Sequence, residues 1–103
     1  MQLVHEGYQQ VNVLKTNKGV FRGGHYHKIS REVFFVISGC VEVDAYVVDC
    51  PQSKQRYLFK QGEFFEILPN TVHSMNFPED CIMVAMYDIC VEKEDGSKDI
   101  YPG

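Results

Sequence analysis

The sequence predicts an all-β domain, either a sandwich or a small barrel built from many short strands. No apolar pattern with the 3.6-residue period of a helix is sustained along the chain. The apolar runs are short and rich in β-branched and aromatic residues, and 13% of the chain is Phe or Tyr, with no Trp. Gly, Pro, Asn and Asp separate these runs at frequent turns, which is typical of sandwiches and barrels.

The first half of the chain is expected to form four or five of these strands. Apolar residues at 11–14 indicate one or two short strands before a turn at 16–19. Residues 20–28 continue as a strand, in which two consecutive glycines allow a close backbone approach. Residues 33–38 are too short, and too β-branched and aromatic, for a helix, so we expect a buried strand. Residues 41–48 then alternate apolar and polar side chains, as in a strand with one buried face.

The second half shows the same pattern of short strands and turns. Its composition predicts a loop at 49–54, after which a strand resumes at 57–59. Three further strands are expected at 63–68, 72–77 and 82–87.

Length and charge restrict the class of protein. At 103 residues the chain can bury one core, so we expect a single domain over 1–103. The net charge of −4, without a basic cluster, argues against nucleic acid as a partner. The longest apolar runs have strand length, so no membrane span is expected. The amino-terminal stretch MQLVHEGYQQ has neither a basic region nor an apolar one, so no signal peptide is expected.

The cysteines and the acidic tail are expected to have structural roles. Without a C-x-x-C spacing, the cysteines are expected to be free thiols in a reducing cytoplasm. Two of them, Cys81 and Cys90, lie at or near the ends of an apolar run and are expected to fill the core. The acidic residues of the tail are expected at a solvated surface: Glu92, Glu94, Asp95 and Asp99.

A His-x-His pair followed by a glutamate is the strongest chemical signal. If residues 25–27 form a strand, its period of two places His25 and His27 on one face, roughly 6.5 Å apart along the strand. A tight turn would then fold Glu32 back beside them at the start of the next strand. Two imidazoles and a carboxylate suit zinc, iron, manganese, nickel or copper.

A third histidine can complete this site. His73 lies far from the pair in sequence, at the start of a strand that follows a Pro-Asn corner. A β-barrel can bring two such strands together with their histidines facing inward. His25, His27, Glu32 and His73 would then offer three nitrogens and one oxygen. Each histidine would also need an acceptor for its other ring nitrogen.

These residues resemble the two motifs of the cupins. The pattern G-x5-H-x-H-x4-E-x6-G, which resembles the first motif, is filled by Gly19, His25, His27, Glu32 and Gly39.

The second motif, G-x5-P-x-G-x2-H-x3-N, is matched less closely. Gly62 and His73 have the required separation, but Leu68 stands at the proline position and Phe77 at the asparagine position. Asn70 stands at the glycine position, where its tolerance of a left-handed backbone suits it.

The resemblance implies a single-domain cupin, a small antiparallel β-barrel of jelly-roll type that often dimerises. It also implies a divalent metal ion (zinc, iron, manganese or nickel) at the mouth of the barrel. The implied ligands are residues like His25, His27, Glu32 and His73.

A finer resemblance concerns residues 22–28, RGGHYHK. This string is similar to the R-G-x-H-x-H-K segment of cupin-fold 3,4-ketoisomerases, and its first part to the 3,5-epimerases, which act on nucleotide-linked keto-sugars. In those enzymes the first histidine transfers a proton and the arginine lies near the substrate. The resemblance therefore implies that His25 is a base and Arg22 a substrate anchor, in an enzyme of polysaccharide biosynthesis.

Two other functions remain open on the same residues. The metal shell would equally serve another class of cupin enzyme, such as a dioxygenase or a phosphosugar isomerase. A cupin that binds a small molecule and catalyses nothing is the third alternative, because the fold alone does not fix the function. An acid opposite His25 would separate these alternatives, and the sequence does not identify one. Tyr26 should point away from the histidines, and the direction in which Glu66 faces is open.

Overall fold

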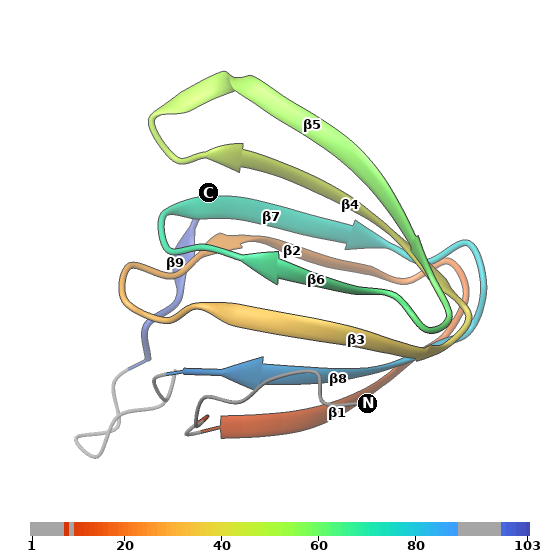
Figure 1. The fold of residues 1–103 in the computed structure, drawn as a ribbon. Helices are drawn as coiled ribbons and strands as arrows, with labels where there is room; N and C mark the ends of the chain where they lie inside the picture. The colour runs from red at the N-terminus through yellow and green to blue at the C-terminus, as the bar shows by residue number, and fades with distance from the viewer. Residues whose placement is uncertain (1–7, 9, 89–97) are drawn as a thin grey trace.

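The computed structural model describes residues 8, 10–88 and 98–103, and within them it is built from strands alone (Figure 1). The predicted all-β class is therefore confirmed, and no helix in this part of the chain is long and apolar enough to cross a membrane. The strands are β1 (Gln10–Thr16), β2 (Phe21–Tyr26), β3 (Glu32–Ser38), β4 (Cys40–Val47), β5 (Cys50–Lys60), β6 (Phe64–Ile67), β7 (Thr71–Asn76), β8 (Cys81–Tyr87) and β9 (Tyr101–Pro102).

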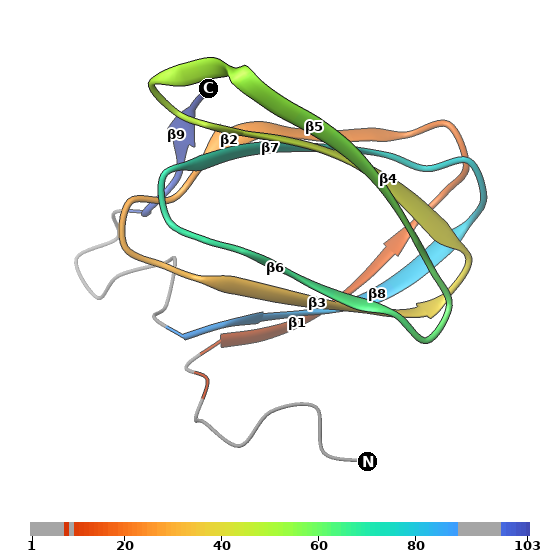
Figure 2. The same ribbon diagram turned by 45° about the horizontal axis from the view of Figure 1, so that its top comes forward.

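The strands form two antiparallel sheets that face one another as a flattened barrel (Figure 2). One sheet has the order β1-β8-β3-β6 and the other the order β5-β4-β7-β2-β9. Most neighbours are therefore distant in sequence, as in the predicted jelly roll. This arrangement lets residues from the two ends of the chain meet at one mouth of the barrel.

The core lies between the two sheets and is apolar and aromatic. Three rings stack through it, with centroids 4.9 Å apart for Phe34 and Phe65 and 4.3 Å for Phe59 and Phe65. Burying each large apolar side chain contributes about 1.5–3 kcal/mol, so this cluster supplies much of the driving force for folding. Cys81 is buried in the same cluster, as predicted, and Cys90 lies outside the described residues.

The predicted loop at 49–54 is wrong, because β4 and β5 form a hairpin whose second strand begins at Cys50. β5 is the edge strand of its sheet, and an edge accommodates Pro51, whose nitrogen cannot donate to a ladder. At the hairpin, the Ser53 hydroxyl accepts the Val47 amide at 3.0 Å and donates to the Cys50 carbonyl at 2.7 Å. The Ser53 side chain thus supplies hydrogen bonds that the backbone lacks where the pairing of β4 with β5 shifts register.

The outer face of the β1-β8-β3-β6 sheet is unusually apolar. Pairing aligns Val13 with Val84, Val84 with Phe35, and Phe35 with Phe64 across the four strands. Val11, Val13 and Phe64 are 58%, 66% and 55% exposed. The outward-facing positions of an antiparallel sheet are usually polar, and here they are apolar. We call this row of side chains, together with Val11, the outer apolar band.

Candidate functional site

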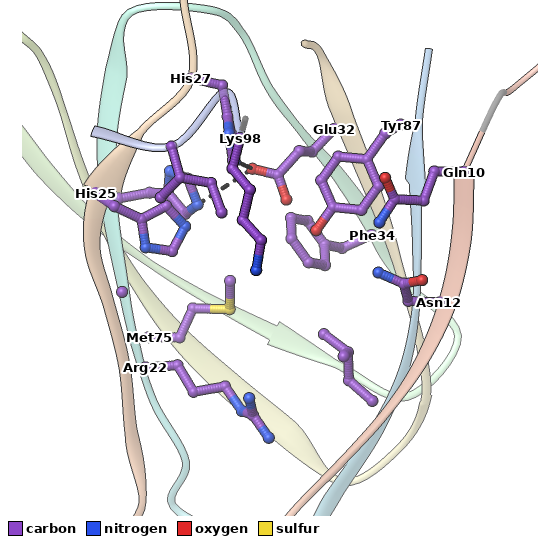
Figure 3. A pocket seen from close by; sticks show the side chains of 14 residues that line it. Gln10, Asn12, Arg22, His25, His27, Glu32, Phe34, Met75, Tyr87 and Lys98 are labelled. Atoms are coloured by element: carbon purple, nitrogen blue, oxygen red, sulfur yellow. Dashed lines mark ion pairs between the residues drawn. The ribbon is translucent and has the colours of Figure 1, made fainter. Parts of the chain in front are cut away.

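A pocket of about 450 Å³ opens between the sheets at one end of the barrel (Figure 3). Strands β1, β2, β3, β7 and β8 contribute to its walls, together with residues of the C-terminal segment. Its apolar floor includes Phe34, as part of the general core.

The four residues expected to form a metal shell converge at this pocket. One potential ligand atom from each of His25, His27, Glu32 and His73 lies within 4.8 Å of the others. The pairing of β2 with β7 sets His25 directly beside His73, with ring centroids 4.6 Å apart. Glu32 is the first residue of β3, after the turn that the sequence predicted.

Of the two glycines before the histidines, Gly23 is the one that lets β2 lie close to β7. Gly23 has a φ of 112°, and a Cβ atom there would lie 2.5 Å from the His73 carbonyl oxygen. Only glycine fits such an approach, and the pairing register shifts between Gly23 and His25. The prediction that residues 25–27 form one strand is wrong in its last residue, because β2 ends at Tyr26 and His27 begins the turn.

The second motif, although it is matched less closely, still positions His73 at the pocket. Asn70 has a φ of 62°, the left-handed backbone that its position predicted. Its amide donates to the His27 carbonyl at 2.6 Å, which links the corner before β7 to the turn after β2. Leu68, at the proline position, is exposed, and Phe77, at the asparagine position, is buried in the core.

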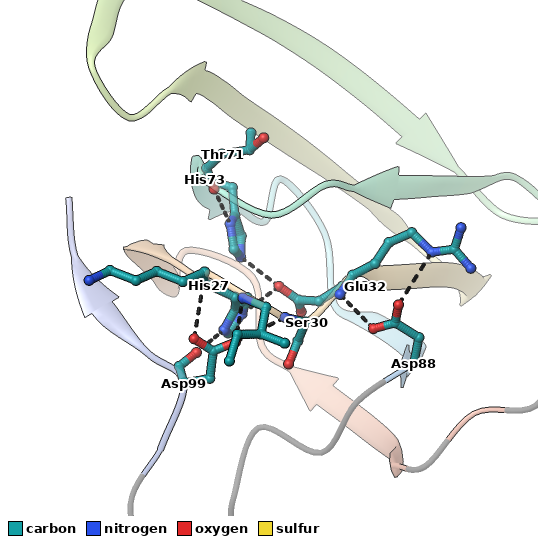
Figure 4. Close-up of polar contacts among 10 residues, drawn as sticks. His27, Ser30, Glu32, Thr71, His73, Asp88 and Asp99 are labelled. Carbon is teal, nitrogen blue, oxygen red and sulfur yellow. Dashed lines mark hydrogen bonds and ion pairs between the residues drawn. The ribbon is translucent and has the colours of Figure 1, made fainter.

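Hydrogen bonds orient two of the histidine rings. His27 Nδ1 donates to the Asp99 carbonyl, and His73 Nδ1 donates to the Thr71 carbonyl at 3.2 Å (Figure 4). Each ring therefore turns Nε2 toward Glu32, whose Oε1 lies 2.6 Å from His27 Nε2 and 3.2 Å from His73 Nε2.

These three atoms make the site receptive to a cation. His27 Nε2, His73 Nε2 and Glu32 Oε1 are buried, and the two ring nitrogens contact no polar group of the described residues other than this one carboxylate oxygen. Two ring lone pairs and a carboxylate oxygen repel one another unless a proton or a metal ion lies among them. The residues therefore fit a divalent ion with nitrogen and oxygen ligands.

Burial and neighbouring charges separate the pKa values of the cluster. Burial raises the Glu32 pKa, but hydrogen bonds and charge from His27 and His73 outweigh it and hold that pKa at about 2. Burial lowers the His27 pKa, and its contacts with Glu32 and Asp99 raise it above 6.5 overall. For His25, burial and the two other histidines lower the pKa to about 4. Near neutral pH, Glu32 is thus charged and His25 is neutral.

The wall opposite His25 carries a hydroxyl group that the sequence did not identify. Tyr87 comes from the facing sheet, pairs with Glu32 across β3 and β8, and directs its hydroxyl into the pocket (Figure 3). Burial, the Glu32 charge and a hydrogen bond to Glu32 raise the Tyr87 pKa, so the hydroxyl stays protonated. Arg22, which the sequence did identify, lies on the same strand as His25 and also lines the pocket; its Nε donates to Thr16 Oγ1 at 2.9 Å.

The structure also shows where Tyr26, Glu66 and Asp99 lie relative to the pocket. Tyr26 points away from the site, as predicted, and packs on Tyr101 with ring centroids 5.5 Å apart. Glu66 does not line this pocket and lies 3.8 Å from Arg31. The expectation that Asp99 is solvated is wrong, because it is 1% exposed and bonded to backbone amides. The other acidic residues of the tail lie outside the described residues.

Comparisons with known proteins find similar folds among solved structures. No protein-family profile and no curated protein sequence matches this chain. CapF from Staphylococcus aureus, a capsular polysaccharide assembling protein, aligns at a TM-score of 0.79 and 21% identity, over 90% of this chain and 26% of CapF. The sugar 3,4-ketoisomerase QdtA from Thermoanaerobacterium thermosaccharolyticum, in complex with TDP, aligns at 0.76 and 18%, over 93% and 67%.

A third solved structure supports the same fold. The dTDP-4-dehydrorhamnose 3,5-epimerase from Sulfolobus tokodaii aligns at a TM-score of 0.64 and 23% identity, over 79% of this chain and 51% of the epimerase. The chain therefore spans only part of each of these proteins. The likeness shows the fold: this is a cupin-type jelly-roll barrel. The predicted resemblance to the cupin fold of nucleotide-sugar isomerases and epimerases is confirmed at that level.

The low Glu32 pKa makes a prediction about acid stability. A carboxyl whose pKa falls on folding from 4.5 to about 2 stabilises the folded state above pH 4.5, and this contribution is lost as pH falls toward 2. In chelator-treated protein, Glu32→Gln should flatten the pH dependence of the free energy of unfolding across this window. Urea titrations at several pH values measure this free energy of unfolding. Glu79→Gln, at an exposed position, is the control. The same dependence of the unfolding free energy on pH in the native protein and both variants would contradict the prediction.

Proposed function

We propose that this chain is a single cupin domain over 1–103 that isomerises or epimerises a nucleotide-linked keto-sugar in polysaccharide biosynthesis. The observation that carries the proposal is a neutral imidazole, His25, facing a protonated hydroxyl, Tyr87, across one pocket. Such a pair can take a proton from one side of a carbon atom and return one from the other.

The structural neighbours support this class of substrate. QdtA has been solved with TDP and, as a mutant, with TDP-4-keto-6-deoxyglucose. Two further neighbours are a dTDP-sugar 3,5-epimerase and a 3,4-ketoisomerase from Helicobacter canadensis. The segment 22–28, which overlaps the first cupin motif at His25 and His27, also resembles the ketoisomerase string. Together these likenesses favour a nucleotide sugar over other small molecules.

Proton transfer through His25 is the proposed chemistry. One His25 nitrogen bonds the Gly23 carbonyl, and the other is free to act as a base near neutral pH. The base takes the proton from the carbon beside the keto group. The electron pair of that C–H bond forms a double bond to the carbonyl carbon, and the π pair of the C=O bond moves to the keto oxygen. Return of a proton to that carbon from Tyr87, on the opposite side, gives an epimer. Return to the former carbonyl carbon, with loss of the neighbouring hydroxyl proton, gives the keto isomer.

Binding of the nucleotide-linked sugar would depend on the part of the pocket where Arg22 lies. Arg22 lies on β2 three residues before His25 and lines the same pocket. Its guanidinium can bind phosphate oxygens with several donors. We therefore propose Arg22 as the anchor that holds the nucleotide-linked sugar with its reacting carbon near His25.

We further propose that a divalent metal ion binds at the cluster. His27, Glu32 and His73 offer buried ligand atoms that face one another, and His25 completes the set. A bound zinc, iron, manganese or nickel ion would supply positive charge for a developing oxyanion. The one remaining His25 nitrogen can bind the metal ion or take a proton, but not both at once. Substitution of His25 must therefore be compared with that of His27, which has only the ligand role.

Hydrogen exchange with solvent tests the proposed chemistry directly. The protein, incubated with TDP-4-keto-6-deoxyglucose in D₂O, should incorporate deuterium beside the keto group, as followed by NMR. His25→Ala should slow this incorporation by about 10²–10⁴-fold, the usual contribution of a general base. Tyr26→Phe, in the neighbouring outward-facing residue, should leave it unchanged. Absence of exchange in the native protein, or equal exchange in His25→Ala, would contradict the proposal.

We also propose a homodimer in which the outer apolar band is buried against its copy. The exposed Val13 and Phe64 support this, since contiguous apolar surface of this kind marks an interface. The double variant Val13→Lys, Phe64→Lys should sediment as a monomer while the native protein sediments as a dimer. Leu58→Lys, at a 50% exposed position of the other sheet, is the matched control. A monomeric native protein, or an unchanged mass in the double variant, would exclude this interface.

The cytoplasm is the proposed location. Cys40, Cys50 and Cys81 are free, as predicted, and free thiols persist in a reducing compartment. A nucleotide-linked substrate would also be found there.

A further inference from the structure

We infer that Asp99 is a positioning residue: it fixes the His27 imidazole and the turn at 28–30, and so joins the C-terminal strap to the candidate metal centre. The C-terminal strap is the described segment 98–103. This inference rests on the proposed metal site, and it assigns a role to a residue that contacts neither metal nor substrate.

The Asp99 carboxylate is held in a cradle of backbone amides. Its Oδ1 accepts the Lys28 amide, and its Oδ2 accepts the amides of Ile29 and Ser30, each at 2.9 Å (Figure 4). The residue is 1% exposed. Consecutive amides that converge in this way form an anion-binding nest, and here the anion comes from the chain itself. The carboxylate therefore fixes the path of the turn between His27 and Glu32.

The main chain of the same residue fixes His27. The Asp99 carbonyl accepts the proton of His27 Nδ1, so Nε2 is left to face Glu32. Outer partners of this kind set the tautomer and the ring direction of a metal-binding histidine. Because the carboxylate and the carbonyl belong to one residue, displacement of the carboxylate from its cradle also moves the carbonyl away from the ring.

Beyond Asp99, backbone contacts also hold the C-terminal strap against β2. β9 pairs with β2, which sets Pro102 beside His25 and Tyr101 beside Tyr26. The Gly103 amide donates to the Gly24 carbonyl at 2.8 Å.

Within the strap, Asp99 lies between two residues that face the pocket. Lys98 and Ile100 both line it, and Figure 3 shows the Lys98 amino group directed into the pocket. Asp99 therefore determines both the direction of a ligand histidine and the position of one pocket wall.

Cobalt affinity tests the inference. Co²⁺ is titrated into native protein, Asp99→Asn and Asp44→Asn, with the visible absorption of the bound ion as the readout. In Asp99→Asn the new side chain keeps the shape but replaces one acceptor oxygen by an NH₂ group, which meets a backbone N–H of the cradle. Affinity should therefore fall about 10–100-fold, the usual effect of losing such a partner. Asp44 is the matched control, a buried carboxylate that Arg56 binds at 2.8 Å outside the pocket. Its variant should bind Co²⁺ like the native protein.

A second measurement does not require metal. In ¹⁵N-labelled, metal-free protein, the His27 Nδ1 proton should give a slowly exchanging NMR signal in the native protein and in Asp44→Asn. In Asp99→Asn this signal should broaden or disappear while the amide spectrum of the barrel is retained. If the native protein binds no Co²⁺, the metal proposal fails, and the His27 signal alone decides the role of Asp99.

Two results would overturn the inference. The first is a folded Asp99→Asn variant with native Co²⁺ affinity, or with a native His27 signal in metal-free protein. The second is an equal loss in Asp99→Asn and Asp44→Asn, which would mean that any buried carboxylate has the same general effect. Asp99→Glu provides a further check, since restoring the charge without the shape should recover part of the lost affinity if the amide cradle is the cause.

Discussion

The mouth of this barrel is organised around one buried oxygen atom. Glu32 Oε1 lies within 3.2 Å of the Nε2 atoms of both His27 and His73, and both rings are turned toward it by bonds to main-chain carbonyls. Such a group is stable only with a proton or a metal ion among its members, because buried lone pairs that face one another would otherwise repel and lack the solvation that water gives them. The local structure therefore favours binding of positive charge, whichever ion or proton supplies it.

Distant parts of the chain are recruited to support this arrangement. β2 approaches β7 closely because Gly23 has no side chain, and Asn70 takes a left-handed backbone to begin β7 in the right place. The C-terminal strap returns to the same mouth through Asp99. Segments from the start, middle and end of the chain thus hold three imidazoles and one carboxylate. An enzyme site benefits from such support, since small misplacements of reacting groups cost much of the rate.

Much of the fold and of the ligand cluster could be predicted from the sequence, because strand periodicity and motif spacing are local signals. Short β-branched and aromatic runs between turn residues identified the strands, and His25, His27 and Glu32 lie within eight residues of one another. Tyr87 and Asp99 could not be found in this way. Tyr87 reads as one more aromatic residue at the end of a buried strand, and its direction depends on pairing with β3. Asp99 lies in an acidic tail, and its burial depends on amides some seventy residues earlier.

The proposed site depends most directly on whether the cluster holds a metal ion. Metal analysis of untagged protein, purified without chelators and compared with His27→Ala, measures this. We expect close to one divalent ion per chain in the native protein and loss of that ion in the variant, with the β-sheet circular dichroism of both retained. The metal site would be contradicted by native protein that stays metal-free after zinc, iron, manganese and nickel are supplied, or by full occupancy in the His27→Ala variant.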